Sequence, residues 1–217
     1  MGVEGVAGML VAVAVICLGA TAWLFFRESW FLQWLRGTIG FLLLGFAFYL
    51  SLLAASLFNY QSAPANAPLA TLSFEADGAQ KWRVTVSEAN GNRRVYDLLG
   101  DLWQLDVRLL RYSGLASVFG APASFELERL SGRYLSVEDE SSKDHSDFQL
   151  LATPFLGFDL WQRATDNGSL IVMPTRSNVA LVPAADGAIF EIRLGDKGLD
   201  LAPANSAADD ALKRVGE

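Results

Sequence analysis

Two long segments without a charged residue constrain the fold of this chain more than any other feature. Residues 5–26 and residues 37–58 are each 22 residues long, and neither contains Asp, Glu, Lys or Arg. At 1.5 Å per residue, a helix of this length is about 33 Å long, enough to cross a hydrocarbon core of about 30 Å. The pattern predicts a transmembrane helical hairpin over 1–60, with helices at 5–26 and 37–58 and a link at 27–36.

A cleaved signal peptide is the main alternative for the first segment. Signal peptides begin with a basic region, whereas Glu4 is the only early charge here, and their apolar stretch is shorter. Lipid attachment at Cys17 would need a small residue before it, and Ile16 stands there. We therefore expect the segment to remain as a membrane anchor.

Charged residues are concentrated in the rest of the chain. Residues 59–217 carry 15 Lys and Arg and 22 Asp and Glu, and the whole chain has a formal net charge of −7. An acidic module lacks the basic surface that neutralises phosphates, which argues against nucleic-acid binding. Residues 1–58 carry four charges, namely Glu4, Arg27, Glu28 and Arg36. The composition thus predicts a membrane part and a water-soluble part.

The basic residues predict the orientation of the hairpin. Arg27 and Arg36 lie in the link, and no Lys or Arg occurs in 1–26 or 37–80. Loops that carry Lys and Arg stay on the cytoplasmic side. We expect the link to be cytoplasmic and both termini to lie on the other side.

The two predicted helices offer no path for a transported substrate. Neither contains a charged residue at depth or a proline, the features that intramembrane ion and substrate sites use. Small residues do form stripes, which let helices approach closely. The stripes indicate either that the two helices pack on each other or that one face docks another membrane protein. The candidate helix docking face is Ala47, Ser51 and Ala55, and a looser stripe is Gly8, Ala12 and Ala20.

The period of the hydrophobic pattern changes from helical to two after a polar linker at 61–68. Alternating segments at 69–203, an Asn-Gly turn at 90–91 and an Asp-Gly turn at 186–187 predict six to eight short antiparallel strands. One short helix is expected from Pro154 to about Thr165. The remaining chain, 204–217, is expected to be a flexible tail with a weak terminal helix.

These elements define the expected fold class. It is a membrane-anchored α+β protein, with a two-helix transmembrane hairpin followed by a mostly antiparallel β domain, either a barrel or a sandwich.

Catalytic and metal chemistry find little support. The single histidine, His145, lies in an acidic stretch at 136–147 whose spacing matches no calcium loop, and the single cysteine, Cys17, lies in the first apolar segment. Histidine triads, thiolate mechanisms and the usual zinc ligand sets are therefore excluded outside the membrane. We expect a solvated acidic loop, no catalytic residue, no metal and no cofactor.

Charged and aromatic residues of the β domain give the candidate ligand or partner surface. Side chains such as Asp106, Glu126 and Glu128 fit cross-strand ion pairs on a wet sheet face. The pair of arginines in RLSGRY fits an anionic headgroup or a partner's carboxylate. The many Trp and Phe residues fit either a packed core or a cavity for a hydrophobic ligand. The surface is assigned to Trp103, Arg108, Arg129, Arg133 and Trp161.

Three segments resemble a family of small bacterial inner-membrane proteins that carry the label "multidrug transporter" or "cation/multidrug efflux pump". They are GDLWQLDVRLL (100–110), RLSGRYLSVE (129–138) and ADGAIFEIRLGDKGLDLAPAN (185–205). The resemblance implies a bacterial inner-membrane protein with a periplasmic domain, and it carries no functional residue over to this chain.

The expected function is that of a non-enzymatic accessory or assembly subunit. The hairpin would anchor it to a larger inner-membrane protein complex, and the periplasmic β domain would contact that complex. The alternative is a module at the periplasmic membrane surface that binds a lipid or another hydrophobic ligand in the β domain.

Overall fold

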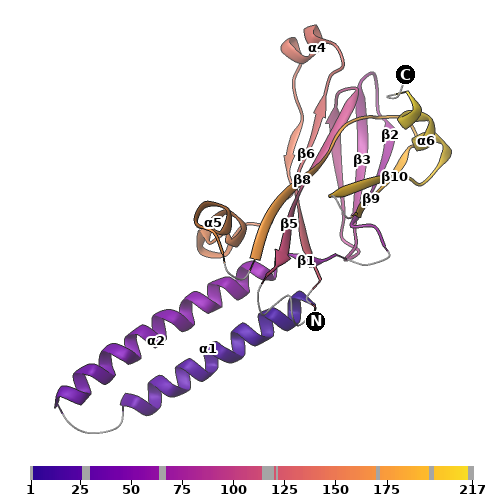
Figure 1. The fold of residues 1–217 in the computed structure, drawn as a ribbon. Helices are drawn as coiled ribbons and strands as arrows, with labels where there is room; N and C mark the ends of the chain where they lie inside the picture. The colour runs from indigo at the N-terminus through magenta and orange to yellow at the C-terminus, as the bar shows by residue number, and fades with distance from the viewer. Residues whose placement is uncertain are drawn as a thin grey trace. The chain divides into compact units, whose positions relative to one another are not determined.

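A computed structural model gives the fold of the chain (Figure 1). It describes residues 2–25, 30–63, 67–113, 120, 122–169, 172–195 and 198–214. The chain divides into two compact units, and the N-terminal unit includes two later segments of the chain. Unit 1 consists of 1–60, 111–122 and 152–173, and unit 2 of 61–110, 123–151 and 174–217.

Unit 1 is built on two long antiparallel helices, α1 (Val3–Phe25) and α2 (Trp30–Leu57). Both have the length and composition of a membrane span. Helix α2 begins at Trp30, seven residues before the predicted start, so the predicted link at 27–36 is wrong for residues 30–36. The stretch WFLQWLR contains no Gly or Pro that would stop the helix from extending.

Small residues spaced seven apart are buried along both helices. Seven residues are close to two helical turns, so residues at this spacing share one face. Small side chains on that face let the two backbones approach closely. We call this set the hairpin seam: Ala7, Ala14 and Thr21 on α1, and Gly40, Ala47 and Ala54 on α2.

The predicted helix docking face does not form one exposed surface. Ala47 is buried in the hairpin seam, Ala55 is half-buried and Ser51 is exposed. Residues four apart shift gradually around the helix, so the predicted stripe runs from a buried face to an exposed one. The buried residues are seven apart and stay on one face. The looser stripe on α1, Gly8, Ala12 and Ala20, is exposed.

A short 3₁₀ turn, η1 (Phe155–Gly157), and a helix, α5 (Leu160–Asn167), contact α2. The predicted helix from Pro154 therefore begins six residues later. Leu156 and Gly157 have φ angles of 51° and 72°, which no α-helix continues through. The side chain of Asp159 instead caps α5, accepting a hydrogen bond from the N–H of Gln162 at 3.2 Å.

Unit 2 contains two antiparallel five-stranded sheets. One sheet has the order β1-β6-β5-β8, with β7 also paired to β6, and the other has the order β10-β9-β2-β3-β4. The strands are β1 (Gln61–Ser62), β2 (Ala70–Ala76), β3 (Lys81–Glu88), β4 (Arg93–Leu99), β5 (Leu102–Tyr112), β6 (Ser124–Arg133), β7 (Asp147–Gln149), β8 (Val172–Pro183), β9 (Ile189–Leu194) and β10 (Leu199–Pro203). The ends of β5 and β8 belong to unit 1.

One of the two predicted turns joins paired strands. β3 and β4 pair on either side of Asn90-Gly91, and Gly91 has a φ of 85°, which glycine adopts without strain. Asp186 and Gly187 instead connect the two sheets, because β8 and β9 belong to different sheets, and Gly187 has a φ of 70°. The alternating pattern predicts antiparallel strands correctly, but the described residues form ten strands and not six to eight.

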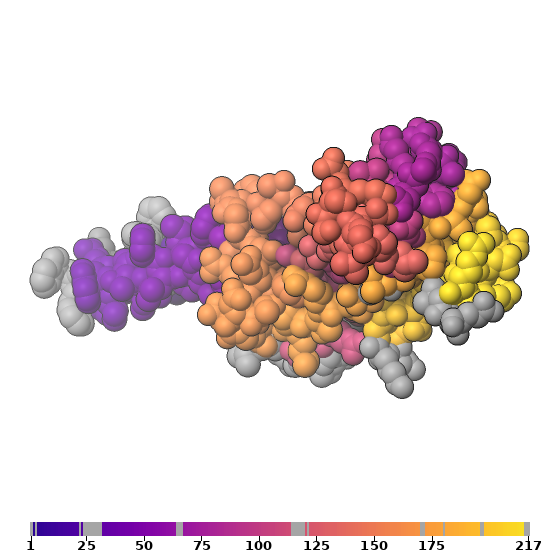
Figure 2. Space-filling model, turned by 90° about the horizontal axis from the view of Figure 1, so that it is seen from above, coloured from indigo at the N-terminus to yellow at the C-terminus, as the bar shows by residue number. Residues whose placement is uncertain are grey.

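Two helices of unit 2 lie in a predicted loop and in the predicted tail, and only the second was expected to be partly helical. Helix α4 (Val137–Ser142) occupies half of the predicted acidic loop, and its residues stand out from the strands (Figures 1 and 2). Helix α6 (Ser206–Lys213) lies in the predicted flexible tail. Asn205 caps α6, and Ala208 and Ala211 are fully buried in the core, which holds this part of the tail in place.

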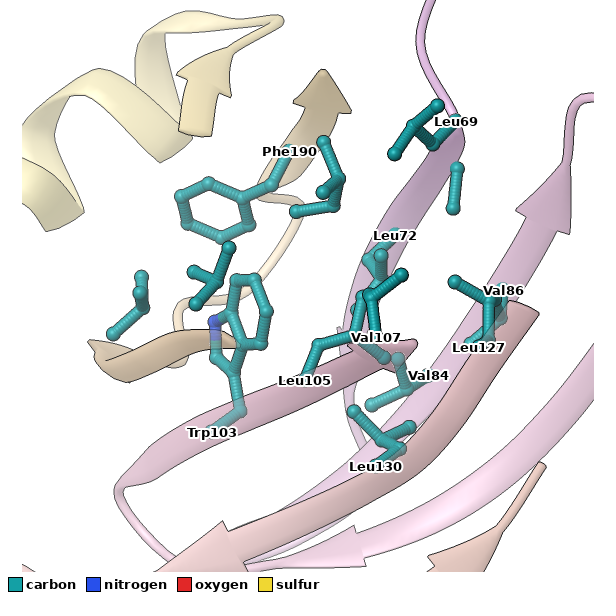
Figure 3. Close-up of a cluster of buried hydrophobic side chains, with 14 of the residues drawn as sticks. Leu69, Leu72, Val84, Val86, Trp103, Leu105, Val107, Leu127, Leu130 and Phe190 are labelled. Carbon is teal, nitrogen blue, oxygen red and sulfur yellow. The ribbon is translucent and has the colours of Figure 1, made fainter. Parts of the chain in front are cut away.

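The core of unit 2 lies between the two sheets and consists mainly of Leu and Val side chains, with a small group of aromatic rings (Figure 3). Trp103 of β5 is fully buried, with its ring centre 5.4 Å from that of Phe74 and 5.3 Å from that of Phe190. Phe74 and Phe190 meet edge to face at 5.8 Å. These rings contact one another directly, which fits core packing rather than a ligand cavity lined by them.

Candidate functional site

Two large apolar side chains are exposed at the start of α4, directly before a run of acidic residues. Leu135 is 75% exposed and Val137 is 79% exposed. Together with neighbouring residues they line a hollow of about 410 Å³. We call this surface the α4 patch, and it consists of Tyr134, Leu135, Ser136, Val137, Glu140 and Ser141. In Figure 2 the segment projects from the face of unit 2 that is turned toward the viewer.

Hydrogen bonds hold the backbone of the α4 patch. The N–H of Tyr134 donates to Oε2 of Glu140 at 2.8 Å, and Nη1 of Arg133 donates to Oε1 of the same carboxylate at 3.1 Å. Nε2 of His145 also lies 3.1 Å from that oxygen. The N–H of Leu135 donates to Oδ2 of Asp101 at 3.1 Å. The exposed leucine is therefore presented on a fixed backbone and not on a loose loop.

Close backbone packing fixes the base of this segment. Gly132, at the end of β6, lies so close to the carbonyl oxygen of Leu99 that a side chain on Gly132 would overlap it. The hydroxyl of Ser146 accepts a hydrogen bond from the N–H of Leu99 at 2.8 Å. Only glycine fits this approach, which explains the Gly in the sequence RLSGRY.

The electrostatics of the α4 patch are acidic. Residues 136–147 carry five carboxylates and one lysine. The hydrogen bond from the N–H of Tyr134, and then the contact with His145, lower the pKa of Glu140 below its ordinary value. Lys143 and Gln80 donate to Asp139 and lower the pKa of that carboxyl in the same way. Both carboxyls are therefore ionised at neutral pH, which favours a basic partner.

The structure separates the residues that were assigned to one ligand or partner surface. Trp103 is fully buried in the core of unit 2 and lies on no surface. Trp161 belongs to α5 in unit 1, where it is 7% exposed. Both rings are buried, so neither residue contributes to an exposed partner surface.

Two arginines of the predicted surface, Arg108 and Arg129, form ion pairs with carboxylates across β5 and β6, as expected for a sheet face. Arg129 donates from Nη2 to Oδ2 of Asp106 at 2.8 Å, and this hydrogen bond raises the pKa of the guanidinium. Nε of Arg108 lies 3.2 Å from Oε1 of Glu128. Arg133 alone among the three lies next to the α4 patch, through its bond to Glu140.

The sequence interpretation missed Leu135 and Val137 as the exposed residues of this segment. The available signal was the position of these two apolar residues directly before a run of acidic residues in LSVEDE. They fit neither the period of two of a strand nor the period of 3.6 of a helix, so no regular element is expected to bury them.

Comparison of the chain with protein-family models, with curated proteins and with solved structures finds no match.

Proposed function

We propose that this chain is a non-enzymatic accessory or assembly subunit of a bacterial inner-membrane protein complex. Helices α1 and α2 anchor it in the membrane, and unit 2 lies in the periplasm as a β-sandwich domain for protein interaction. The α4 patch contacts a partner protein whose surface offers an apolar recess bordered by Lys or Arg.

The observation that carries this proposal is the exposure of Leu135 and Val137 on a fixed, acidic surface. Covering a hydrophobic side chain that is held out in water lowers the free energy, and exposed apolar patches rimmed by polar residues mark protein interaction sites. The surrounding carboxylates select a partner of opposite charge and discourage non-specific association. A basic, partly apolar partner satisfies both features.

Anchoring and orientation are supported by separate features. The lengths of α1 and α2 match a hydrocarbon core, and Arg27 and Arg36 favour a cytoplasmic connection between the helices. The two sheets have separate strand orders and a shared core, which supports a sandwich rather than a barrel.

Loss of a co-purifying protein tests the role of the α4 patch. The variant carries Leu135→Ser and Val137→Ser, and the matched control carries Val95→Ser on β4, where the valine is 56% exposed. Wild type and both variants are purified from the native membrane in mild detergent, and co-purifying proteins are quantified by mass spectrometry. We expect a partner at fixed stoichiometry with wild type and with the control, and its loss from the double variant. Equal recovery from all three would contradict the proposal.

A groove on the helices allows a second test, which asks whether the helices contact a helix of the partner complex. Ala47 and Ser51 line a shallow apolar groove of about 520 Å³ together with Leu18, Phe41 and Phe48. Ser51→Leu fills this groove without entering the hairpin seam, and Ala12→Leu places the same side chain on the exposed face of α1. If the groove docks a helix of the complex, the first variant loses the partner and the second keeps it. If both keep it, the helices serve only as an anchor.

A further inference from the structure

Unit 1 contains a mostly apolar hollow of about 400 Å³ whose lining includes a few polar side chains. Its walls come from α1, α2, residues 158–169 and Val172. The apolar lining includes Leu10, Phe46, Leu50, Leu53 and Leu57. The polar lining includes Arg163, Asn167 and Ser169.

The arginine of the lining packs over an aromatic ring. The guanidinium carbon of Arg163 lies 4.7 Å from the centre of the Phe158 ring, and that ring meets Tyr49 edge to face at 6.0 Å. Such stacking orients a guanidinium and leaves its N–H groups free to bind an anion. No carboxylate among the described residues lies within 4.0 Å of the guanidinium nitrogens of Arg163.

The position along α2 relates the hollow to the membrane. Its wall runs from Phe46 to Leu57, the C-terminal part of the apolar span that ends at Leu57. Phe155 and Leu156, on the turn that contacts α2, are 59% and 72% exposed. Exposed apolar groups beside the end of a membrane helix are expected at the level of the lipid headgroups.

We propose that this hollow binds an anionic phospholipid of the surrounding membrane. One acyl chain lies against the leucines and Phe46, and the phosphate is held by Arg163 with Asn167 beside it. The apolar lining favours an acyl chain, and the cation in the lining favours a negatively charged headgroup, so the two kinds of lining match the two parts of one lipid. The inference rests on the membrane anchoring in the proposed function and not on the partner at the α4 patch.

Native mass spectrometry of the full chain tests the site. The protein is released from mixed micelles that contain phosphatidylglycerol or phosphatidylcholine with the same acyl chains. We expect wild type to retain one phosphatidylglycerol with a preference of about fivefold over phosphatidylcholine, as expected for one arginine near the headgroup. Arg163→Gln should abolish the preference, and Arg163→Lys should keep part of it.

A matched control removes a positive charge elsewhere. Arg93→Gln changes an exposed arginine of β4 in unit 2 and should retain the wild-type preference. Phe46→Ala, which shortens the apolar wall, should weaken phosphatidylglycerol retention several-fold and leave the fold intact, because Phe46 is 49% exposed.

Three results would overturn the proposal. The first is equal retention of the two lipids by wild type, and the second is an unchanged preference in Arg163→Gln. The third is binding of inorganic phosphate that depends on Arg163 while lipid is not retained, which would identify an anion site without a lipid. Loss of a partner protein on mutation of the α4 patch is read in a separate experiment, so either proposal can fail alone.

Discussion

The N–H of Leu160 donates a hydrogen bond to Oγ of Ser56 at 3.1 Å, joining the first turn of α5 to the last turn of α2. Ser56 is 4% exposed, so the bond is shielded from water. The first N–H groups of a helix have no partner within that helix, and here a serine 104 positions earlier supplies one.

Ser56→Ala should therefore release α5 from α2. The buried N–H of Leu160 would lose its acceptor, which costs roughly 1–3 kcal/mol. Amide hydrogen exchange of the purified chain in detergent should show faster exchange across 158–167. Ser51→Ala is the matched control, because the hydroxyl of Ser51 bonds to the carbonyl of Ala47 within its own helix and is exposed. Equal exchange in the two variants would show that the bond does not hold α5.

Ala14→Leu should destabilise the helical hairpin. Ala14 lies in the hairpin seam and is 5% exposed, so a larger side chain pushes the helices apart at a cost of about 1–3 kcal/mol. Ala12→Leu, two residues away on the exposed face of α1, should have little effect. Thermal unfolding in detergent measures both. A melting temperature that falls equally in the two variants would contradict the close packing of the two helices at Ala14.

Gly132→Ala should destabilise unit 2, because the added methyl group overlaps the backbone carbonyl of Leu99. Overpacking against backbone costs about 1–3 kcal/mol. Ser131→Ala is the control at the next position. Its hydroxyl is buried and has no hydrogen-bond partner among the described residues, so the change should be neutral or slightly stabilising. Chemical denaturation measures the difference, and equal midpoints would argue against close packing at Gly132.

The α4 patch should loosen in acid. The folded pKa of Glu140 is lowered from its ordinary value of 4.5, so its stabilising contribution is present above pH 4.5 and is lost as the pH falls through the folded pKa. Hydrogen exchange at Tyr134, followed from about pH 6 into increasingly acidic solution and corrected for the intrinsic rate, should show loss of protection. Glu140→Gln should remove most of this dependence. A wild-type profile in that variant would assign the effect to another carboxyl, such as Asp139.

The sequence predicted the elements better than it predicted their contacts. Two uncharged segments and the period of two at 69–203 gave the helices and the strands, because burial of one face determines both patterns. The sequence analysis does not identify the residues of the hairpin seam. Ala7, Ala14 and Thr21 are not all of one type, and only their burial against the second helix shows that they share a face. The start of α5 depends on the positive φ of Leu156, for which no sequence signal exists at a leucine.

The candidate site was predicted less well than the fold. Arg133 is one of the predicted surface residues. It supports the α4 patch by donating a hydrogen bond to Glu140, but it is not part of the patch itself. Trp103 and Trp161 were assigned to a surface from residue type alone, and tryptophan is as suited to a core as to an interface. Leu135 and Val137 became visible only when the hydrogen bonds around Glu140 showed that their exposure is held in place.

A photo-crosslinking amino acid at position 137, in the full chain in native membranes, tests the proposed partner contact most directly. The same residue at position 95 on β4 is the control, since Val95 and Val137 are both exposed valines of unit 2. An accessory subunit that docks through the α4 patch should give one defined protein adduct from position 137 and none from position 95. No adduct at position 137, or the same adducts from both positions, would contradict a partner at the α4 patch.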